Sequence, residues 1–132
     1  MPTLKPHAIG LLALLIVVTD ARPFELERAL QNTAAYINSS APRPIGHDAV
    51  LDGAVGYEST LKYRFTFRRL TKEQLGPAFT SRQTEFLTDF VCTNPGMAVF
   101  VENGVTLKYA YHDRNGQLVA LISVDPKTCV VE

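Results

Sequence analysis

The stretch YESTLKYRFTFR, residues 57–68, alternates between apolar and polar side chains. Continued back to Val55, its odd positions carry large apolar groups with one interruption, at Ser59. These groups are Val55, Tyr57, Leu61, Tyr63, Phe65 and Phe67. Successive side chains of a β-strand point to opposite faces of a sheet. The period of two therefore predicts one long antiparallel strand whose aromatic face is buried and whose charged face is wet.

Two amphipathic helices are predicted on either side of this strand. In residues 23–37, Pro23 suits a first helical turn, and the side chains of one face recur three and four residues apart. That face consists of Leu26, Ala29, Leu30, Thr33, Ala34 and Ile37. After the strand, Thr71 and Gln74 have the spacing of a capping box. Helical spacing then returns in Phe79, Phe86, Leu87, Phe90 and Val91 and ends near Cys92.

Residues 97–124 are predicted to form an antiparallel meander of three strands. Asn103-Gly104, between two apolar runs, is typical of a tight hairpin turn, because both central residues of that turn need positive φ. A second turn at residues 113–116 leads into the strand 118–124. The predicted fold is thus an α+β domain of order α-β-α-β-β-β. In it, two helices pack on a four-stranded antiparallel sheet, similar to cystatin-like and other curled-sheet folds.

Both faces of this predicted meander are apolar. The face turned away from the helices would combine Met97, Val99, Val101, Val119 and Leu121. Such a face needs a second cover. Either the chain's own segment 41–56 or a strong curl of the sheet supplies that cover, or the face binds a partner protein or a second copy of the chain.

Four tyrosines at alternating strand positions allow two interpretations. They are Tyr57, Tyr63, Tyr109 and Tyr111. Aromatic side chains on one face of a sheet more often belong to the core. The alternative is an aromatic platform that binds a small apolar ligand.

The N-terminal residues have the pattern of a secretory signal. Lys5 and the amino terminus supply positive charge, residues 8–18 are uncharged and apolar, and small side chains at Thr19 and Ala21 suit a signal peptidase. We therefore expect a cleaved signal peptide over residues 1–21 and one mature domain over residues 22–132. The expected location is periplasmic or secreted, without membrane insertion after cleavage. A retained anchor and a buried core helix are the alternatives.

The expected state of the two cysteines, Cys92 and Cys129, depends on this compartment. In an oxidising space an even pair of thiols usually forms a disulfide, and the spacing of this pair suits no metal site. We expect the bond to form. Two free buried thiols are the alternative if the protein stays in a reducing compartment.

Charge and motif content exclude several classes of function. Lys plus Arg equals Asp plus Glu at 13 each, so no basic excess attracts nucleic acid. His47 and His112 each precede an aspartate, but adjacent residues of an extended chain point apart, so neither pair is a catalytic dyad by itself. The sequence contains no nucleophile elbow, no metal-ligand spacing and no phosphate loop. It therefore predicts neither an enzyme nor a cofactor or metal site.

Several short motifs stand in a distinctive order along the chain. A helix ending in Tyr36-Ile37-Asn38 is followed by Pro42, by Leu61-Lys62-Tyr63-Arg64-Phe65, by Cys92 and Gly104, by the run from Tyr109 to Gly116, and by Cys129. In this combination the chain resembles a group of small secreted bacterial proteins that are mostly uncharacterised. The resemblance covers nearly the whole mature chain and supports export and the disulfide. It implies no catalytic residues.

The function predicted from these observations is binding. The first hypothesis is a periplasmic or secreted module that binds another protein, as an inhibitor, an immunity-type protein or a secretion-system accessory. The second hypothesis is a carrier of a small apolar ligand, held between the helices and the sheet near Tyr63 and Tyr109.

Overall fold

The computed structural model describes residues 23–129. The signal peptide predicted for residues 1–21 lies outside this part of the chain. The elements follow in the order α2 (Pro23–Asn38), β1 (Arg43–Ile45), β2 (Ala49–Tyr57), β3 (Thr60–Phe67), α3 (Lys72–Leu75), α4 (Phe79–Thr93), η1 (Pro95–Met97), α5 (Ala98–Glu102), β4 (Thr106–His112), β5 (Leu118–Val124) and η2 (Pro126–Cys129). None of the helices in residues 23–129 is long and apolar enough to span a membrane.

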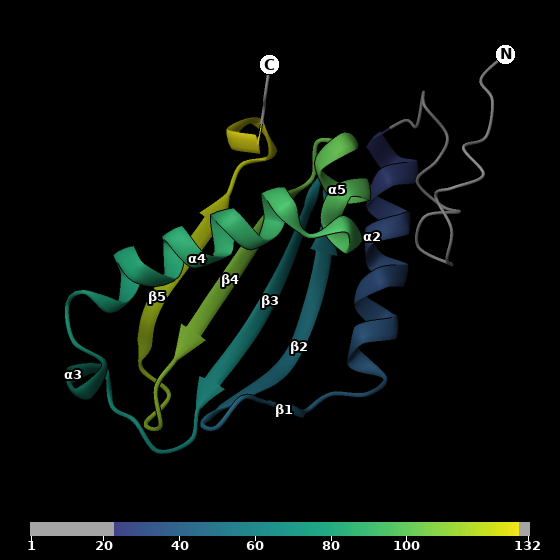
Figure 1. The fold of residues 1–132 in the computed structure, drawn as a ribbon. Helices are drawn as coiled ribbons and strands as arrows, with labels where there is room; N and C mark the ends of the chain where they lie inside the picture. Colours follow the sequence, from purple (N-terminus) through teal and green to yellow (C-terminus); the bar gives the residue numbers. More distant parts are fainter. Residues whose placement is uncertain (1–22, 130–132) are drawn as a thin grey trace, which may run out of the picture.

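The five strands form one mixed sheet in the order β1-β2-β3-β4-β5. All neighbours are antiparallel except β3 and β4, which are parallel. Parallel neighbours need a long crossover connection, and α3, α4 and α5 supply it here (Figure 1). The predicted α+β class is confirmed. The predicted fully antiparallel sheet of four strands with two helices is wrong in these details.

The long strand predicted from residue 55 to residue 68 is a hairpin of two strands. Tyr57 ends β2 and lies opposite Thr60, which begins β3, and Glu58 in the two-residue turn has a φ of 51°. The turn therefore puts Val55 and Tyr57 of β2 on the same face as the even positions of β3. A register shift between Leu51 and Gly53 returns Ala49 and Leu51 to the face of Phe65 and Phe67. Apolar and polar residues continue to alternate through the turn, so the sequence pattern does not indicate that the strand is interrupted there.

The strand predicted for residues 97–102 is helical, since η1 and α5 occupy it. The Asn-Gly pair that follows ends α5 instead of turning a hairpin. The N–H of Gly104 donates to the carbonyl of Val101 at 3.1 Å, and the N–H of Val105 donates to the carbonyl of Phe100 at 3.0 Å. These are the two hydrogen bonds of a Schellman motif. The φ of 71° at Gly104 suits this helix cap as well as a hairpin turn, which explains the wrong prediction.

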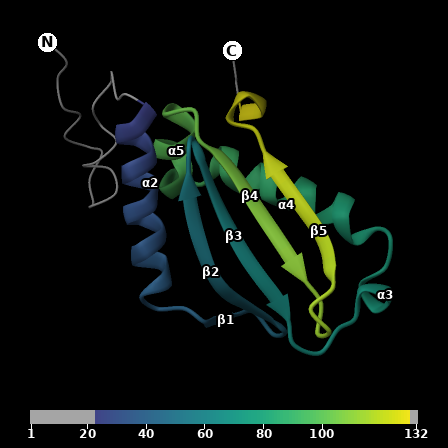
Figure 2. The same ribbon diagram turned by 180° about the vertical axis from the view of Figure 1, so that it is seen from behind.

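The two faces of the sheet differ in what covers them. The covered face carries Leu61, Tyr63, Phe65 and Phe67 of β3 and packs against α4, which crosses it obliquely (Figure 1). The open face carries Lys62 and Arg64, and no described helix lies over it (Figure 2). Residues 41–56, one of the covers expected for a second apolar face, instead form β1 and most of β2.

Helix α2 closes the edge of β2 beyond the short strand β1 (Figure 2). Its buried residues Leu30 and Ala34 join the core. Beside Gly56 the helix backbone comes so close that a Cβ there would lie 2.5 Å from the carbonyl carbon of Leu30. At the end of α2, the side chain of Asn38 donates to the carbonyl of Ala54 at 3.0 Å and accepts from its N–H at 2.7 Å. The helix thus satisfies backbone groups of β2 that β1 does not reach.

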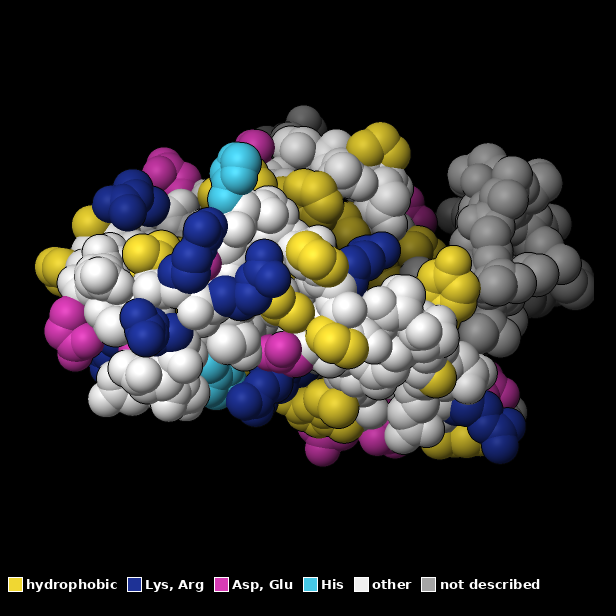
Figure 3. Space-filling view, turned by 90° about the horizontal axis from the view of Figure 1, so that it is seen from below, with side chains coloured by type: hydrophobic (Ala, Val, Ile, Leu, Met, Phe, Trp, Pro, Cys, Tyr) yellow, Lys and Arg dark blue, Asp and Glu magenta, His cyan; other side chains and the backbone are white. Residues whose placement is uncertain are grey.

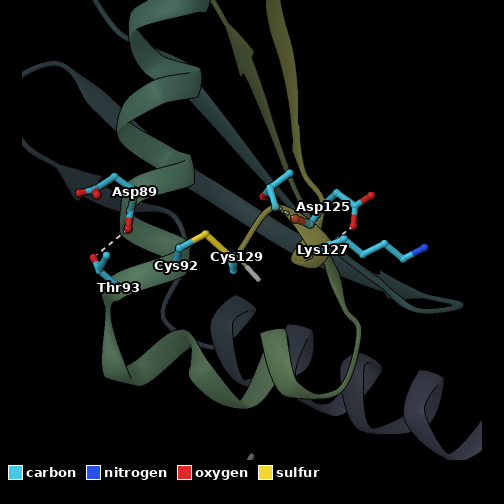
Figure 4. The surroundings of a disulfide bond; sticks show 7 residues. Asp89, Cys92, Thr93, Asp125, Lys127 and Cys129 are labelled. Atoms are coloured by element: carbon cyan, nitrogen blue, oxygen red, sulfur yellow. Dashed lines mark hydrogen bonds between the residues drawn. A yellow bond between two sulfur atoms is a disulfide. The ribbon is translucent and has the colours of Figure 1, made fainter. Parts of the chain in front are cut away.

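A disulfide joins Cys92 and Cys129 (Figure 4). Cys92 lies in the last turn of α4, and Cys129 ends η2, directly after β5. The bond therefore ties the helix of the covered face to the segment that follows the last strand.

Asp113 is a buried polar centre between the β4–β5 turn and the start of α3. Its side chain is fully buried and accepts backbone N–H bonds from Lys72 at 2.8 Å, from Asn115 at 2.8 Å and from Gln117 at 2.9 Å. Burial by itself would raise the pKa of this carboxyl. These hydrogen bonds and the nearby Lys72 charge outweigh burial, so the pKa lies below its usual value.

The Asp113 carboxylate predicts a pH dependence of stability. A pKa that is lower in the folded state than in the unfolded state stabilises the fold above the unfolded pKa, about 3.9, and this contribution is lost as the pH falls through the folded pKa. At neutral pH we expect the wild type to have a higher melting temperature than Asp113→Asn. Below about pH 4 the melting temperature of the wild type should fall more steeply than that of the variant. Thermal melts of both proteins between acid and neutral pH measure this. Parallel curves for the two proteins would contradict it.

Candidate functional site: an aromatic groove on the covered face

A groove of about 470 Å³ lies between α4 and the β1–β2 end of the covered face. We call it the aromatic groove. The strands line it with Ile45, Ala49, Leu51, Tyr63, Phe65, Phe67, Tyr109 and Tyr111, and the crossover lines it with Phe79, Gln83, Phe86, Leu87, Phe90 and Met97. None of these side chains carries a formal charge at neutral pH. A second hollow adjoins the groove through Leu51 and Tyr63 and extends it to Tyr36 at the end of α2.

The register of the parallel pair β3–β4 builds the floor of the groove. It places Tyr63 beside Tyr109, and their rings stack with centroids 5.1 Å apart. The next pair on this face, Phe65 and Tyr111, stacks at the same 5.1 Å. Aromatic pairs at such distances contribute more than their buried area alone. The floor is therefore a continuous surface of stacked aromatic rings.

The rim of the groove exposes large apolar side chains to solvent. Phe86 is 60% exposed, Ile45 is 40% exposed and Phe90 is 37% exposed. Phe86 and Phe90 lie four residues apart on α4, and their rings stack at 6.4 Å. Clustered apolar side chains that a small domain leaves in water mark a binding surface.

The phenols on the floor are neutral at physiological pH. Burial raises the pKa of Tyr63 to about 12. Burial also raises the pKa of Tyr109, and its interactions with Tyr63 and Tyr111 raise it further. The pKa of Tyr111 is raised by burial too, although a hydrogen bond of 2.9 Å from Gln83 Nε2 to its hydroxyl acts in the opposite direction. An uncharged groove of this kind favours an apolar ligand surface.

The structure brings together three of the four tyrosines singled out as a ligand platform. Tyr63, Tyr109 and Tyr111 line the groove. Tyr57 does not, because it pairs with Thr60 and so alternates to the other face of the sheet. The rim residues Ile45, Phe86 and Phe90 were missing from the predicted platform. The sequence does indicate two of them. Phe86 and Phe90 make the apolar face of their helix wider than packing against the core requires.

The residues predicted as a partner surface do not form one surface, which corrects that prediction. Met97 is buried at the end of the groove, and Val99 and Val101 of α5 pack against the core. Val119 also packs against the core, while Leu121 is 49% exposed. The prediction failed because it treated a helical segment as a strand.

Basic side chains are concentrated on two parts of the surface although the whole chain carries no net charge. On the open face, Lys62 lies directly beside Lys108 on the neighbouring strand, and Arg64 pairs with Asp52 at 3.7 Å. At the end of the sheet that carries the β4–β5 turn, Lys and Arg side chains gather (Figure 3). Exposed residues of this end include Arg68, Arg69, Lys72 and Arg114.

The two histidine–aspartate neighbours of the sequence form no dyad. The Asp48 carboxylate accepts from the backbone N–H and Nε of Arg69, not from His47. The carboxylate of Asp113 accepts from backbone N–H groups, and His112 Nδ1 has no partner within the described residues. Residues 23–129 also contain no group of His, Cys, Asp and Glu that could hold a metal ion.

Solved structures of known proteins share this fold. No family model and no curated protein matches the chain. A Pseudomonas aeruginosa protein that is thought to be secreted is 25% identical, with a TM-score of 0.72 over 82% of this chain and 96% of that chain. EpsS, the pilotin of the Vibrio vulnificus type 2 secretion system, is 14% identical, with a TM-score of 0.69 over 83% and 96% of the two chains. AspS, a type II secretion system pilotin from Vibrio cholerae, is 18% identical, with a TM-score of 0.65 over 81% and 94%.

Proposed function

We propose that this chain is a non-enzymatic secretion-system accessory that acts outside the cytoplasm and binds an apolar segment of a partner protein in the aromatic groove. The observation that carries the proposal is the exposed aromatic rim, with Phe86 at 60% and Phe90 at 37% exposure above an uncharged floor. The fold shared with two secretion pilotins supports an accessory role. The disulfide suits an oxidising compartment.

The form of the groove favours an amphipathic helix as the bound segment. A bound strand would need a free backbone edge to pair with. The groove offers only a short one, because the edge strand β1 has three residues with Pro44 at its centre, which has no N–H to donate, and Asn38 occupies the backbone groups of Ala54. Recognition therefore depends on side chains, and a helix presents its apolar side chains three and four residues apart on one stripe. Such a stripe would insert between α4 and Ile45.

The size of the groove also supports the second candidate, a carrier of a small apolar ligand. A volume of about 470 Å³ lies within the range of small-molecule sites, about 300–1,000 Å³. The stacked rings of Tyr63 and Tyr109 would contact such a ligand from below. A lipid-like molecule that co-purifies with the protein in native mass spectrometry, and that occupies the groove, would favour the carrier over the peptide-binding module.

Replacing Phe86 by aspartate tests the groove. Loss of an aromatic side chain that a bound segment covers costs about 2 kcal/mol or more, and the new carboxylate would have to be desolvated, so we expect at least about 30-fold weaker binding. Two readouts measure this: the fluorescence of the apolar dye bis-ANS bound to the purified protein, and the recovery of a partner from periplasmic extract of the native host.

The chain offers a matched control for this substitution. Phe24 of α2 is also 60% exposed and does not line the groove. Phe24→Asp should therefore keep both the dye binding and the partner of the wild type. Equal behaviour of Phe24→Asp and Phe86→Asp in both readouts would refute a role for the groove.

A further inference from the structure

The open face of the sheet carries a hollow of its own, with a volume of about 630 Å³. We call it the open-face hollow. The strand registers put Gly53, Arg64 and Ala110 in one row across β2, β3 and β4. Glycine and alanine add almost no bulk on either side of Arg64, and no described helix lies over this face (Figure 2). The volume is within the range of small-molecule sites, about 300–1,000 Å³.

The hollow is cationic on the side of β3. Lys62 and Arg64 line it, and Lys108 of β4 lies directly beside Lys62. The acidic residue among its described lining residues is Asp52, whose carboxylate is already engaged by Arg64 and by the hydroxyl of Thr66. Within residues 23–129 neither lysine has an ion pair. Like charges side by side on neighbouring strands are destabilising, and a bound anion would relieve this repulsion.

The hollow is apolar on the side of β5. Leu121 pairs with Ala110 and Leu118 pairs with His112, so both leucines lie on the open face. Each leucine lines the hollow and is 49% exposed. Val55 lines it from β2 and is 54% exposed. Exposed apolar side chains that gather beside cations suit a ligand with both an apolar and an anionic part.

We propose that the open-face hollow binds a small anionic amphiphile, a single alkyl chain that carries a carboxylate or phosphate head. The head would lie between the amino groups of Lys62 and Lys108, and Arg64 has further N–H donors beyond its contact with Asp52. The alkyl chain would extend over Ala110 and cover the β5 leucines.

The two sides of the hollow together select this class of ligand. An inorganic anion would leave the leucines in water, and an uncharged apolar molecule would leave the two lysines without a counter-charge. A stable protein interface buries about 800 Å² of each partner, which is far more than a hollow of this size offers. The site lies on the opposite face of the sheet from the aromatic groove, so it does not depend on the function proposed for that groove.

Titrations of the ¹⁵N-labelled mature protein, residues 22–132, followed by amide NMR spectra, test the proposal. The probes are decanoate and decyl phosphate, below their micelle concentrations. Decanol lacks the charge and inorganic phosphate lacks the chain. Both alkyl anions should shift the amides of Lys62, Ala110 and Leu121 saturably and bind at least about 10-fold more tightly than either control. The tighter alkyl anion identifies the head as a carboxylate or a phosphate.

Substitutions separate the two parts of the site. Lys62→Gln/Lys108→Gln should bind decanoate about 10-fold more weakly, because two partly exposed ion pairs are lost. Without ligand, its melting temperature should be no lower than that of the wild type, since the like-charge pair is gone. Leu121→Thr should weaken the binding of decanoate but not that of inorganic phosphate. Lys127→Gln, at an exposed lysine outside the hollow, should bind as the wild type does.

Several results would overturn the proposal. Equal affinities for decanoate and decanol would do so, as would an unchanged affinity for decanoate in the double lysine variant. Shifts confined to the amides of Phe86 and Phe90 would place the alkyl chain in the aromatic groove instead. Shifts at the hollow with an acetylated pentapeptide of alternating glutamate and leucine, but with neither alkyl anion, would assign the hollow to a protein partner. If a variant fails to fold, the comparison of probes on the wild type decides.

Discussion

Removing the disulfide is expected to lower the free energy of unfolding by about 4 kcal/mol. Cys92 and Cys129 are 37 residues apart, and closing a loop of this length restricts the unfolded chain by about that amount in the chain-entropy model. The total stability of a domain of this size is about 5–15 kcal/mol. The bond therefore accounts for a large share of it, and chemical denaturation of the Cys92→Ala/Cys129→Ala variant measures the loss.

A reducing agent provides the control for this prediction. It should lower the denaturation midpoint of the wild type to that of the double variant and leave the variant itself unchanged. Thr93, next to Cys92, is exposed, and Thr93→Ala should change stability by less than about 1 kcal/mol. A double variant as stable as the wild type would show that the bond does not constrain the unfolded chain.

Replacing Gly56 by alanine is expected to displace α2 and to destabilise the protein by about 1–3 kcal/mol. The added Cβ would lie 2.5 Å from the carbonyl carbon of Leu30, 2.6 Å from its oxygen and 2.8 Å from the nitrogen of Gln31. These are backbone atoms, so no change of rotamer relieves the clash and the helix itself must move. Chemical denaturation measures the loss of stability, and faster amide exchange along α2 locates it.

Gly104 offers a matched glycine with a different physical role. A Cβ at Gly104 meets no atom within 4 Å, but the residue has a φ of 71°. Gly104→Ala should therefore cost about 1 kcal/mol through backbone strain at the end of α5 and leave exchange in α2 unchanged. If Gly56→Ala also left amide exchange along α2 unchanged, this result would contradict the close packing of α2 against β2.

Local patterns of the sequence predicted most helices and strands well. The helical spacing of residues 23–37 and the capping box at Thr71 and Gln74 both correspond to helices of the structure. The alternation around Tyr63 and Tyr109 corresponds to β3 and β4. Each of these signals arises within one element, where the period of the side chains follows directly from backbone geometry.

The candidate site could be predicted only in part. Tyr63, Tyr109 and Tyr111 were expected to act together, and the structure places them on the floor of one groove. Tyr57 was expected among them and lies on the other face. The groove as such had no local signal, because its floor depends on the parallel pairing of β3 with β4, and its rim comes from α4 and β1.

The sequence by itself determined the apolar face of α2, the alternation of β3 and β4 and the cysteine pair, because each of these is a property of a single segment or of composition. Tertiary structure alone decided the parallel neighbours β3 and β4, the helical course of residues 97–102 and the exposure of the aromatic rim. A glycine with positive φ serves a helix cap and a hairpin equally well, and a two-residue turn can preserve an alternating pattern. Such local ambiguities are resolved only when distant segments compete to bury the same apolar surface.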